Sequence, residues 1–443
     1  MPKQFLDLGI NEQFQQSLVD LQITLPTQVQ EKTIPAVLNT TKDLVVLSKT
    51  GTGKTLAFGL PLLQLIKVED TNIQALILAP TRELGQQIFS NMVSFASHND
   101  QIQIVSLCGG TPIKPQIEQL KSTTHLVVAT PGRLLDLIKR GAIDIKQLEY
   151  LVLDEADEML SALKEEVDTL LKTIPKNRRT FLFTATMPGT VKQLVQNYMS
   201  KKLVQIDVDI ATLGHQGIDH QYVVVEPIEK LDVLLHFLNT KAGERGIIFC
   251  KTKAAVNKLA KKLAINKFSS GSIHGSLTQG IRDRIMEQFR AGYIDILVAT
   301  DLASRGIDVK EISYVVNYHL PDTYEAYVHR SGRTARAGAK GFSLTILQEE
   351  EVTEIADFEK ELGLVFHKFK KADAQSIKEN NAVLWAKKIF KTKPNREVSN
   401  ELNTKIKTVF HHLTKDELID KILAKHLSES KVEVFTPKPL NKN

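Results

Sequence analysis

The sequence predicts an α/β protein with two tandem domains, each a parallel β-sheet covered by helices, and a short helical C-terminal extension. Three observations support this fold class. Short apolar runs rich in β-branched residues alternate with helical stretches, which is typical of parallel sheets. The 443 residues exceed what one hydrophobic core usually holds. After about Lys371 the strand pattern stops and helical spacing replaces it.

The apolar runs fall into two series, which predict an N-terminal domain over residues 1–208 and a C-terminal domain over residues 218–371. Between them, residues 209–217 contain two glycines and no sustained apolar periodicity, so we expect a linker able to act as a hinge. The first series predicts strands at residues 43–47, 75–79, 102–107, 125–129, 150–153, 180–184 and 203–208. The second predicts strands at residues 221–225, 246–250, 272–274, 294–299, 313–317 and 342–347.

Residues 372–443 form a basic tail, which we expect to be mainly helical with a frayed end. Apolar residues repeat at helical spacing over residues 402–413 and 418–427, and Thr414 with Glu417 predicts a capping box for the second helix. Residues 376–443 hold 14 Lys and Arg against 8 Asp and Glu, a balance of +6 that equals the net charge of the whole chain. The tail's charges could bind RNA or a partner, or its helices could pack on the second domain with their lysines solvated.

Composition indicates a globular protein, with 42% apolar and 24% charged residues. No run approaches the roughly 18 apolar residues of a membrane span, and the first residues lack the features of a secretory signal. We therefore expect a cytoplasmic protein that does not cross a membrane. The two cysteines, Cys108 and Cys250, each end a strand-like run, which predicts buried thiols rather than a disulfide or a metal site.

A phosphate-binding loop is predicted at Ser48–Thr55, because it follows a strand and opens a helical run. The backbone of residues 50–53 would wrap around phosphate oxygens, and glycine at positions 51 and 53 allows this close approach. Lys54 supplies a charge to the terminal phosphates, and the Thr55 hydroxyl can hold Mg²⁺. Ser48 stands where this type of loop commonly has glycine. The candidate nucleotide-binding residues are Thr50, Gly51, Thr52, Gly53, Lys54 and Thr55.

An apolar strand ends in the carboxylates of Asp154-Glu155-Ala156-Asp157. In open parallel sheets the carboxyl ends of strands are where ligands bind. Asp154 is placed to hold Mg²⁺, partly through water, and Glu155 is the candidate for polarising the attacking water. A solvated acidic turn is the alternative for these four residues alone. The P-loop roughly a hundred residues upstream favours the magnesium–nucleotide site.

Further motifs, in order and spacing, resemble those of the DEAD-box RNA helicases over about Phe5 to Leu347. The resemblance implies two RecA-like domains and an ATP-dependent enzyme that acts on RNA. The motifs that carry it are Pro80–Leu84, Gly109–Gly110, Thr130–Arg133, Thr184–Thr186, Ala299–Asp308 and His329–Arg336.

In proteins of this family a glutamine reads adenine and an upstream aromatic ring stacks on it. Gln30 and Phe5 occupy those places, and the resemblance therefore implies ATP as the nucleotide. An amide can donate to and accept from the adenine edge, and a ring offers a stacking face. The Gly-aromatic pair that usually opens this motif is Gln22-Ile23 here.

The resemblance assigns further roles across the two domains. Arg333 and Arg336 would act as arginine fingers on the terminal phosphates, so hydrolysis would require domain closure. Two residues, Gly306 and Asp308, would lie near the ribose and phosphates of the nucleotide. Three others would couple the two domains: Thr184, Thr186 and His329.

By the same resemblance, loops after the strands hold the sugar-phosphate backbone of RNA. Such contacts carry no base identity, so the core should bind single strands or short duplexes without sequence preference and more weakly as salt rises. In the first domain the candidates are Pro80, Thr81, Arg82, Gly110, Thr130 and Arg133. In the second domain they are Gly275, Arg282 and Thr300.

The sequence therefore predicts an RNA-stimulated ATPase that unwinds short RNA duplexes or remodels RNA–protein complexes. Two alternatives stay open. One is a DNA-directed helicase or translocase that shares the two-domain engine. The other is an ATP-gated RNA clamp that serves as an assembly platform and separates few strands. The physiological RNA, accessory proteins and oligomeric state do not follow from the sequence.

Overall fold

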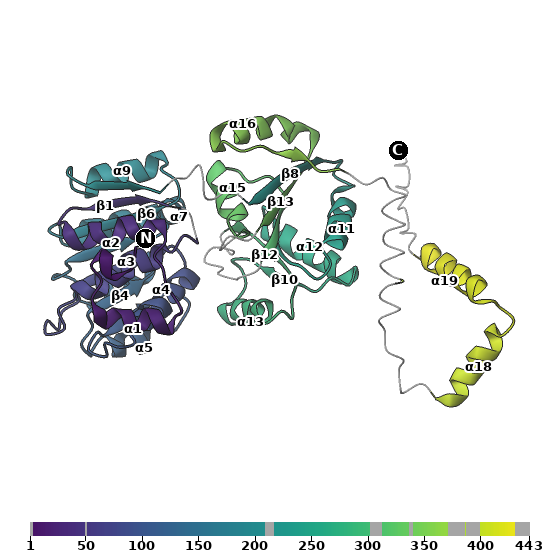
Figure 1. Cartoon of the computed structure of the whole chain (residues 1–443), viewed down its shortest axis with the longest axis horizontal. Coiled ribbons are helices and arrows are strands. Elements are labelled where there is room, and N and C mark those ends of the chain that lie inside the picture. Colours follow the sequence, from purple (N-terminus) through teal and green to yellow (C-terminus); the bar gives the residue numbers. More distant parts are fainter. Residues whose placement is uncertain are drawn as a thin grey trace, which may run out of the picture. The chain divides into compact units, whose positions relative to one another are not determined.

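The computed structural model describes residues 3–48, 51–208, 217–301, 312–335, 340–370, 386 and 399–429. Within them lie two seven-stranded sheets in which every pairing is parallel (Figure 1). The predicted fold class is confirmed, and a strand occurs at each of the thirteen predicted runs. The predicted linker, apart from Gly217, lies outside the described residues. So do four candidate site residues, Thr50, Gly306, Asp308 and Arg336.

The first sheet has the strand order β3-β4-β2-β5-β6-β1-β7. Three of its seven strands, β1, β2 and β4, are four-residue apolar runs buried along their whole length, as expected for strands covered on both faces. The strands are β1 (Leu44–Leu47), β2 (Ala75–Leu78), β3 (Ile104–Leu107), β4 (Leu126–Ala129), β5 (Tyr150–Leu153), β6 (Arg179–Thr184) and β7 (Val204–Asp207).

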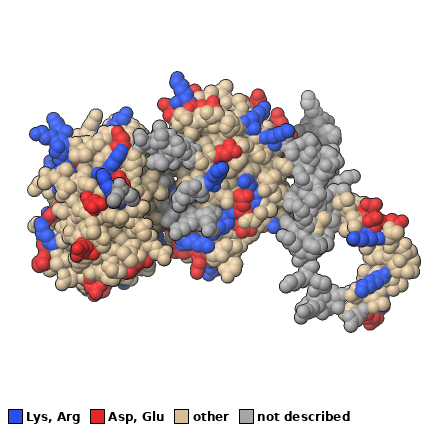
Figure 2. All heavy atoms as spheres, in the orientation of Figure 1, with Lys and Arg blue, Asp and Glu red and all other residues tan. Residues whose placement is uncertain are grey.

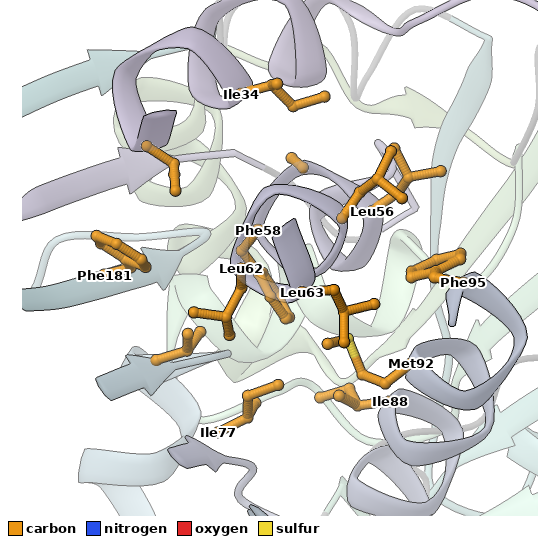
Figure 3. Close-up of a cluster of buried hydrophobic side chains, with 14 of the residues drawn as sticks. Ile34, Leu56, Phe58, Leu62, Leu63, Ile77, Ile88, Met92, Phe95 and Phe181 are labelled. Atoms are coloured by element: carbon orange, nitrogen blue, oxygen red, sulfur yellow. The ribbon is translucent and has the colours of Figure 1, made fainter. Parts of the chain in front are cut away.

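Helices cover both faces of this sheet. They are η1 (Leu6–Leu8), α1 (Glu12–Asp20), α2 (Gln28–Asn39), α3 (Lys54–Leu65), α4 (Arg82–Phe95), α5 (Ile113–Gln119), α6 (Pro131–Lys139), α7 (Ala156–Ala162), α8 (Lys164–Thr173) and α9 (Gly189–Tyr198). Figure 3 shows the cluster in which Phe58 and Leu62 of α3 meet Met92 of α4 and Phe181 of β6. Helix α3 comes so close to α4 that a Cβ on Gly59 would lie 2.6 Å from Met92 Sδ. This tight packing fixes the helix that opens with the P-loop lysine.

Strand order divides the carboxyl edge of the first sheet into two halves. β5, β6 and β1 are neighbours, and they lead into the acidic tetrad, the Thr184–Thr186 motif and the P-loop. β3, β4 and β2 are neighbours at the other side, and they lead into the candidate RNA-binding loops. Because parallel strands end at one edge of a sheet, the two sets of loops lie side by side on one domain.

The second sheet has the order β10-β11-β9-β12-β13-β8-β14. β14 is absent from the sequence prediction, because two polar residues give no apolar run. Its strands are β8 (Ile218–Val224), β9 (Arg245–Phe249), β10 (Ser270–Ile273), β11 (Ile296–Ala299), β12 (Ile312–Asn317), β13 (Gly341–Leu347) and β14 (His367–Lys368). The helices that accompany it are α12 (Lys253–Ile265), α13 (Gln279–Arg290), α15 (Tyr324–Ser331), η3 (Glu349–Glu351) and α16 (Val352–Leu362).

A second compact unit holds α11 (Lys230–Thr240) and the tail helices α18 (Asn400–Phe410) and α19 (Lys415–Glu429). The capping box is confirmed, since Thr414 N donates to Glu417 Oε2 over 2.8 Å and Glu417 N donates to Thr414 Oγ1 over 3.3 Å. Six large apolar residues of the two tail helices are exposed, so the packing of these helices on the second sheet stays a prediction. They are Leu402, Ile406, Val409, Phe410, Ile419 and Ile422.

None of the described helices is both long and apolar enough to pass through a bilayer. Both cysteines are buried and unpaired, as predicted, and burial raises the pKa of each thiol.

The end of α1 explains what Gln22-Ile23 does in place of a glycine–aromatic pair. Gln22 N donates to Val19 O and Ile23 N donates to Leu18 O, both over 2.9 Å, which is the hydrogen-bond pattern of a Schellman motif. Gln22 occupies the left-handed position of this motif, with φ of 57°. Ile23 packs against the cluster that contains Leu18, so it supplies the apolar contact of the motif.

The Gln22→Gly substitution should stabilise the protein. Glycine adopts the left-handed conformation without the Cβ clash, but it loses more conformational entropy on folding than glutamine does. The net effect should be an increase of about 0.5–1 kcal/mol in the free energy of unfolding. Urea unfolding followed by circular dichroism measures it. As a matched control, Gln13→Gly within α1 should cost about 1 kcal/mol, because that residue is helical and exposed. Equal destabilisation by both substitutions would contradict the assignment.

Candidate ATP site and RNA-facing loops

The P-loop joins β1 to α3, which begins at Lys54. Gly51 and Gly53 have φ of 80° and 92°, a left-handed backbone that glycine adopts without strain. Lys54 is buried, and its Nζ donates to Ser48 O over 3.2 Å and lies 3.9 Å from Asp154 Oδ1. The ammonium group is thus held at the carboxyl end of β5. Ser48 Oγ and Thr52 Oγ1 share a hydrogen bond of 2.6 Å, so serine here ties the two ends of the loop together.

Gln30 connects α2 to the P-loop. Its Oε1 accepts from Thr27 N over 2.8 Å, and its Nε2 donates to Gly53 O over 3.1 Å. The amide retains a second proton and a second lone pair, so it can still meet an adenine edge as predicted. The same amide explains Gly53, since a Cβ there would overlap Gln30 Nε2. Phe5 is 3% exposed and belongs to the hydrophobic cluster around Leu8, so its stacking role stays a prediction.

The acidic tetrad is buried at the end of β5 and the start of α7. Burial raises the pKa of Asp154 to about 6, and the Lys54 charge opposes that rise. Burial and the neighbouring Glu158 carboxylate raise the pKa of Glu155. Glu155 has φ of 50°, a left-handed conformation that is strained for glutamate and typical of functional sites. Its Oε2 is buried without a hydrogen-bond partner among the described groups.

These observations fit a magnesium ion with its water ligands. A cation beside Asp154 would stabilise its ionised form, and a metal-bound or attacking water would satisfy Glu155 Oε2. The described residues contain no group of three or more His, Cys, Asp or Glu side chains placed to hold a metal by themselves. Magnesium is usually bound through one or two carboxylates together with substrate phosphates, so this arrangement suits it. Thr55, the second residue of α3, is the predicted hydroxyl ligand.

Asp157 joins three segments of the chain. Its Oδ2 accepts from Thr186 N over 2.9 Å and from Thr186 Oγ1 over 2.7 Å. His329 Nε2 of α15 lies 3.4 Å from the same oxygen, and His329 Nδ1 lies 3.0 Å from Glu158 Oε1. Both histidine pairs lie within ion-pair distance, although neither has hydrogen-bond geometry. Thr184 Oγ1 donates to Thr186 O over 2.7 Å, so threonine in place of serine keeps this loop contact.

The charges of this cluster stabilise one another. Burial would raise the pKa of Asp157, but its interactions with His329 and Thr186 outweigh burial and hold that pKa well below its ordinary value. Burial would lower the pKa of His329, but the Glu158 and Asp157 carboxylates raise it to about 9. The imidazole is therefore protonated at neutral pH. Two of the three predicted coupling residues, Thr186 and His329, thus meet at the Asp157 carboxylate, and the third, Thr184, bonds Thr186.

Arg333, a predicted arginine finger, is 4% exposed and its charge lowers the pKa of Glu155. Its Nε donates to His329 O over 3.2 Å, which holds the guanidinium near the acidic cluster. Arg330 in the same motif is structural, because Asp301 binds two of its nitrogens and Asn317 binds the third. The second predicted finger, at position 336, is outside the described residues.

The candidate RNA loops of the first sheet form one bonded layer. Thr81 caps α4 by accepting from Leu84 N over 3.3 Å. Arg82 Nη1 donates to Gly110 O over 3.2 Å, and Thr130 Oγ1 accepts from Gly109 N over 3.2 Å. Pro80 is buried where β2 ends. The loops after β2, β3 and β4 therefore hold one another in place.

Arg133 also bonds within this layer, to Thr111 O over 2.8 Å and to Gln116 Oε1. Arginine has five N–H donors, so a phosphate contact remains open to it. On the face drawn in Figure 2, Lys and Arg are interspersed with Asp and Glu over the described residues and form no continuous basic surface. Anion binding then depends on such local donors rather than on net charge.

In the second sheet, Gly275 follows β10 and Thr300 follows β11. A Cβ on Gly275 would meet open space, which leaves the backbone there accessible. Arg282 of α13 pairs with Glu83 of α4 through an Nη2–Oε1 distance of 2.9 Å. Gln279 Nε2 donates to the same Glu83 oxygen over 3.2 Å. The predicted RNA residue Arg282 therefore has a protein partner in this structure.

Comparison with known proteins assigns the family. Residues 27–194 match the DEAD/DEAH box helicase model, and residues 229–338 match the helicase conserved C-terminal domain. The chain is 38% identical over 407 residues to the ATP-dependent RNA helicase DbpA of Bacillus subtilis, covering 92% of this chain and 84% of that protein. It belongs to the DEAD-box ATP-dependent RNA helicases.

Other members of the DEAD-box family agree with this. The chain is 41% identical to the ATP-dependent RNA helicase CshA of Listeria monocytogenes, covering 79% of this chain and 66% of that protein. Among solved structures, Saccharomyces cerevisiae Dbp5 bound to RNA and ADP BeF3 matches with a TM-score of 0.78 at 28% identity. The match covers 86% of this chain and 100% of the Dbp5 chain. Residues 377–430 match a helical domain described for a probable ATP-dependent RNA helicase.

Several residues of this DEAD-box site escaped the sequence prediction. The sequence motifs assign no separate role to Asp157, Glu158, Glu83 or Gln279. One signal exists for Glu158: it lies between an apolar strand and the apolar residues Met159 and Leu160, and an acidic side chain buried there requires a cationic partner. The partners of Glu83 come from a helix almost two hundred residues away, so local pattern could not reveal them.

Stability of the nucleotide-free, magnesium-free protein should depend on pH through His329. Its pKa rises from an ordinary value near 6.5 in the unfolded chain to about 9 in the folded one. The protonated ring therefore stabilises the fold fully below about pH 6.5, and this contribution is lost as pH rises through 9. We expect wild type to lose roughly 2–3 kcal/mol between pH 7 and pH 9.5 in urea unfolding.

His329→Gln is the control for this dependence. It should be less stable than wild type at pH 7, because Asp157 and Glu158 lose their buried cation. Its stability should then change less between the two pH values. Parallel pH profiles for the two proteins would show that His329 does not carry the effect.

Proposed function

We propose that this chain is an RNA-stimulated ATPase that locally separates short RNA duplexes or remodels RNA–protein complexes. The observation that carries the proposal is the shared carboxylate of Asp157, which meets Thr186 in the loop after β6 and His329 of α15. The ATP site is thereby connected to the motif after β6 and to the helix that leads to Arg333. Hydrolysis would then require both domains to be in place, as expected when closure controls the reaction.

ATP would bind with its phosphates on the P-loop backbone and Lys54. Thr55 and Asp154 would hold Mg²⁺, the latter partly through water, and the metal would neutralise phosphate charge and orient its waters. Gln30 would read the adenine edge through its remaining proton and lone pair. Thr50, Gly306 and Asp308 are assigned by family resemblance alone.

Glu155 would accept a proton from the attacking water. Its raised pKa and its buried, unpartnered oxygen suit a carboxylate that must bind water and take up a proton. Arg333, and by resemblance Arg336, would stabilise charge that develops on the transferred phosphoryl group. Arginine fingers of this kind contribute roughly 10³–10⁵ in rate.

RNA would bind along the loops after β2, β4 and β3, and along Gly275, Arg282 and Thr300 of the second sheet. Backbone N–H groups, threonine hydroxyls and arginine side chains bind phosphates without reading bases. To contact phosphate, Arg282 would have to share or leave Glu83. RNA bent across both domains could not remain in an A-form duplex, which would separate its strands locally.

The rival functions are separated by stimulation and displacement assays. ATPase activity of the full chain should rise with single-stranded RNA and stay basal with single-stranded DNA of the same sequence. Equal stimulation by DNA would favour the DNA-directed helicase. An RNA clamp would show a long-lived RNA complex with an ATP analogue and little strand displacement.

Two substitutions test the assigned roles in ATP hydrolysis. Lys54→Ala should abolish productive nucleotide binding, because the ammonium group beside the phosphates is lost. Glu155→Gln should bind ATP without hydrolysing it, and should therefore hold RNA for longer than wild type. Nucleotide binding, single-turnover hydrolysis and RNA dissociation measure these effects. Normal turnover by Glu155→Gln would refute its role.

Truncation after Gln375 tests the basic tail. If the tail supplies auxiliary RNA affinity, its loss should weaken RNA binding and reduce the slope of log affinity against log salt, because fewer cations then meet phosphates. RNA affinity measured across a salt series gives both quantities. Unchanged affinity and slope would assign the tail's lysines to solvent.

A further inference from the structure

An open cleft of about 520 Å³ lies between α4, α5 and the edge strand β3 of the first sheet. Apart from Arg82, its lining residues carry none of the binding or catalytic roles assigned above. Its wall is about equally polar and apolar: four glutamine amides and several hydroxyl groups alternate with side chains such as Phe89 and Val105, and Arg82 is the one charged residue among those that line it. Arg82 and Thr111 also belong to the bonded layer of candidate RNA loops. The cleft is therefore continuous with the proposed RNA path.

Strand β3 contributes hydrogen-bonding backbone to this cleft. It lies at the end of the sheet order and pairs with β4 alone in the part of the chain that the structure describes. Gln103 O and Leu107 O accept from the β4 side, so the alternate residues Ile104 and Ser106 direct their N–H and C=O groups outward. Both line the cleft. Donors and acceptors of the main chain thus stand beside the amide side chains.

Three side chains have the chemistry that a nucleobase requires. Gln86 and Phe89 of α4 are three residues apart and lie on one face of the helix, and Gln119 comes from α5. Both glutamines are exposed, and no side-chain partner is recorded for either amide among the described residues. Phe89 is partly buried against the core and offers an aromatic surface. Gln116, in contrast, is buried and holds Cys108 O and Arg133.

We infer that this cleft binds a base of the single-stranded RNA next to the backbone-gripped segment, with adenine preferred. The inference rests on the proposed function. Phe89 stacks on the base, the amides of Gln86 and Gln119 bond its donor–acceptor edge, and Arg82 holds the phosphate at the mouth. An amide matches the adjacent donor and acceptor of adenine. The cleft volume falls in the range of small-ligand sites. The chain therefore combines a backbone grip without sequence preference with one base-reading position.

An extended peptide could also pair with the edge of β3. Continuity with Arg82 and the loop before α5 favours RNA over a peptide.

Binding of labelled oligoadenylate and oligouridylate of equal length to the full chain, saturated with ADP–beryllium fluoride, tests the inference. Wild type should bind oligoadenylate at least about fivefold more tightly, the effect of one stacked and hydrogen-bonded base. Phe89→Leu and the double substitution Gln86→Ala with Gln119→Ala should reduce that ratio to near one. They should retain affinity for oligouridylate and RNA-stimulated ATPase activity. Gln193→Ala on α9, an exposed helical glutamine away from the cleft, should keep the wild-type ratio.

The outcomes are separable. If wild type shows no base preference, or if the cleft variants keep it, the inference is overturned and the edge of β3 is left as a peptide site. If wild type shows no RNA-stimulated ATPase activity at all, the proposed function fails instead. A photoreactive adenine analogue placed along the oligonucleotide gives an independent readout, because it should crosslink to the peptide that contains Phe89 from one position only. Melting temperatures near that of wild type show that the variants fold.

Discussion

The site depends on the burial of one carboxylate. Asp157 is nearly inaccessible to water, and an ionised carboxylate in such a place is stable only when its oxygens are bonded and its charge is matched. Thr186 supplies two hydrogen bonds and His329 supplies the charge. Removing Thr186 would leave the buried carboxylate short of hydrogen bonds, and removing His329 would leave its charge unmatched. The geometry of the acidic cluster therefore requires that the loop after β6 and helix α15 both be in place.

Sheet topology assigns the chemistry to separate halves of one edge. The P-loop, the tetrad and the threonine motif follow β1, β5 and β6, which adjoin one another although they are far apart in sequence. The candidate RNA loops follow β2, β3 and β4 on the other side. Since β2 and β5 are paired neighbours, the two sites share a boundary within one rigid sheet. The β2–β5 pair is therefore the shortest connection through the sheet between the loops of the ATP site and the candidate RNA loops.

The sequence predicted much of this, because the signals for it are local. Buried parallel strands are continuous apolar runs, and the P-loop, the tetrad and the capping box at Thr414 are short motifs with their own geometry. What could not be predicted depends on tertiary contacts. The amide of Gln30 bonds the P-loop, Arg133 bonds its own layer of loops, and Arg282 pairs with Glu83. Each of these pairings joins elements whose proximity only the fold defines.

The left-handed residue at the end of β5 has a consequence for how two carboxylates meet one ligand. Successive side chains on an extended strand point to opposite faces, so Asp154 and Glu155 would ordinarily diverge. With φ of 50° at Glu155 the chain reverses into α7; burial raises the pKa of both carboxyl groups, and the Lys54 charge opposes that rise in each. The carboxylate proposed to hold the metal and the one proposed to accept the proton can thus be neighbours in the chain and still serve one site. Glu155, the proposed proton acceptor, is also the residue at which the chain turns.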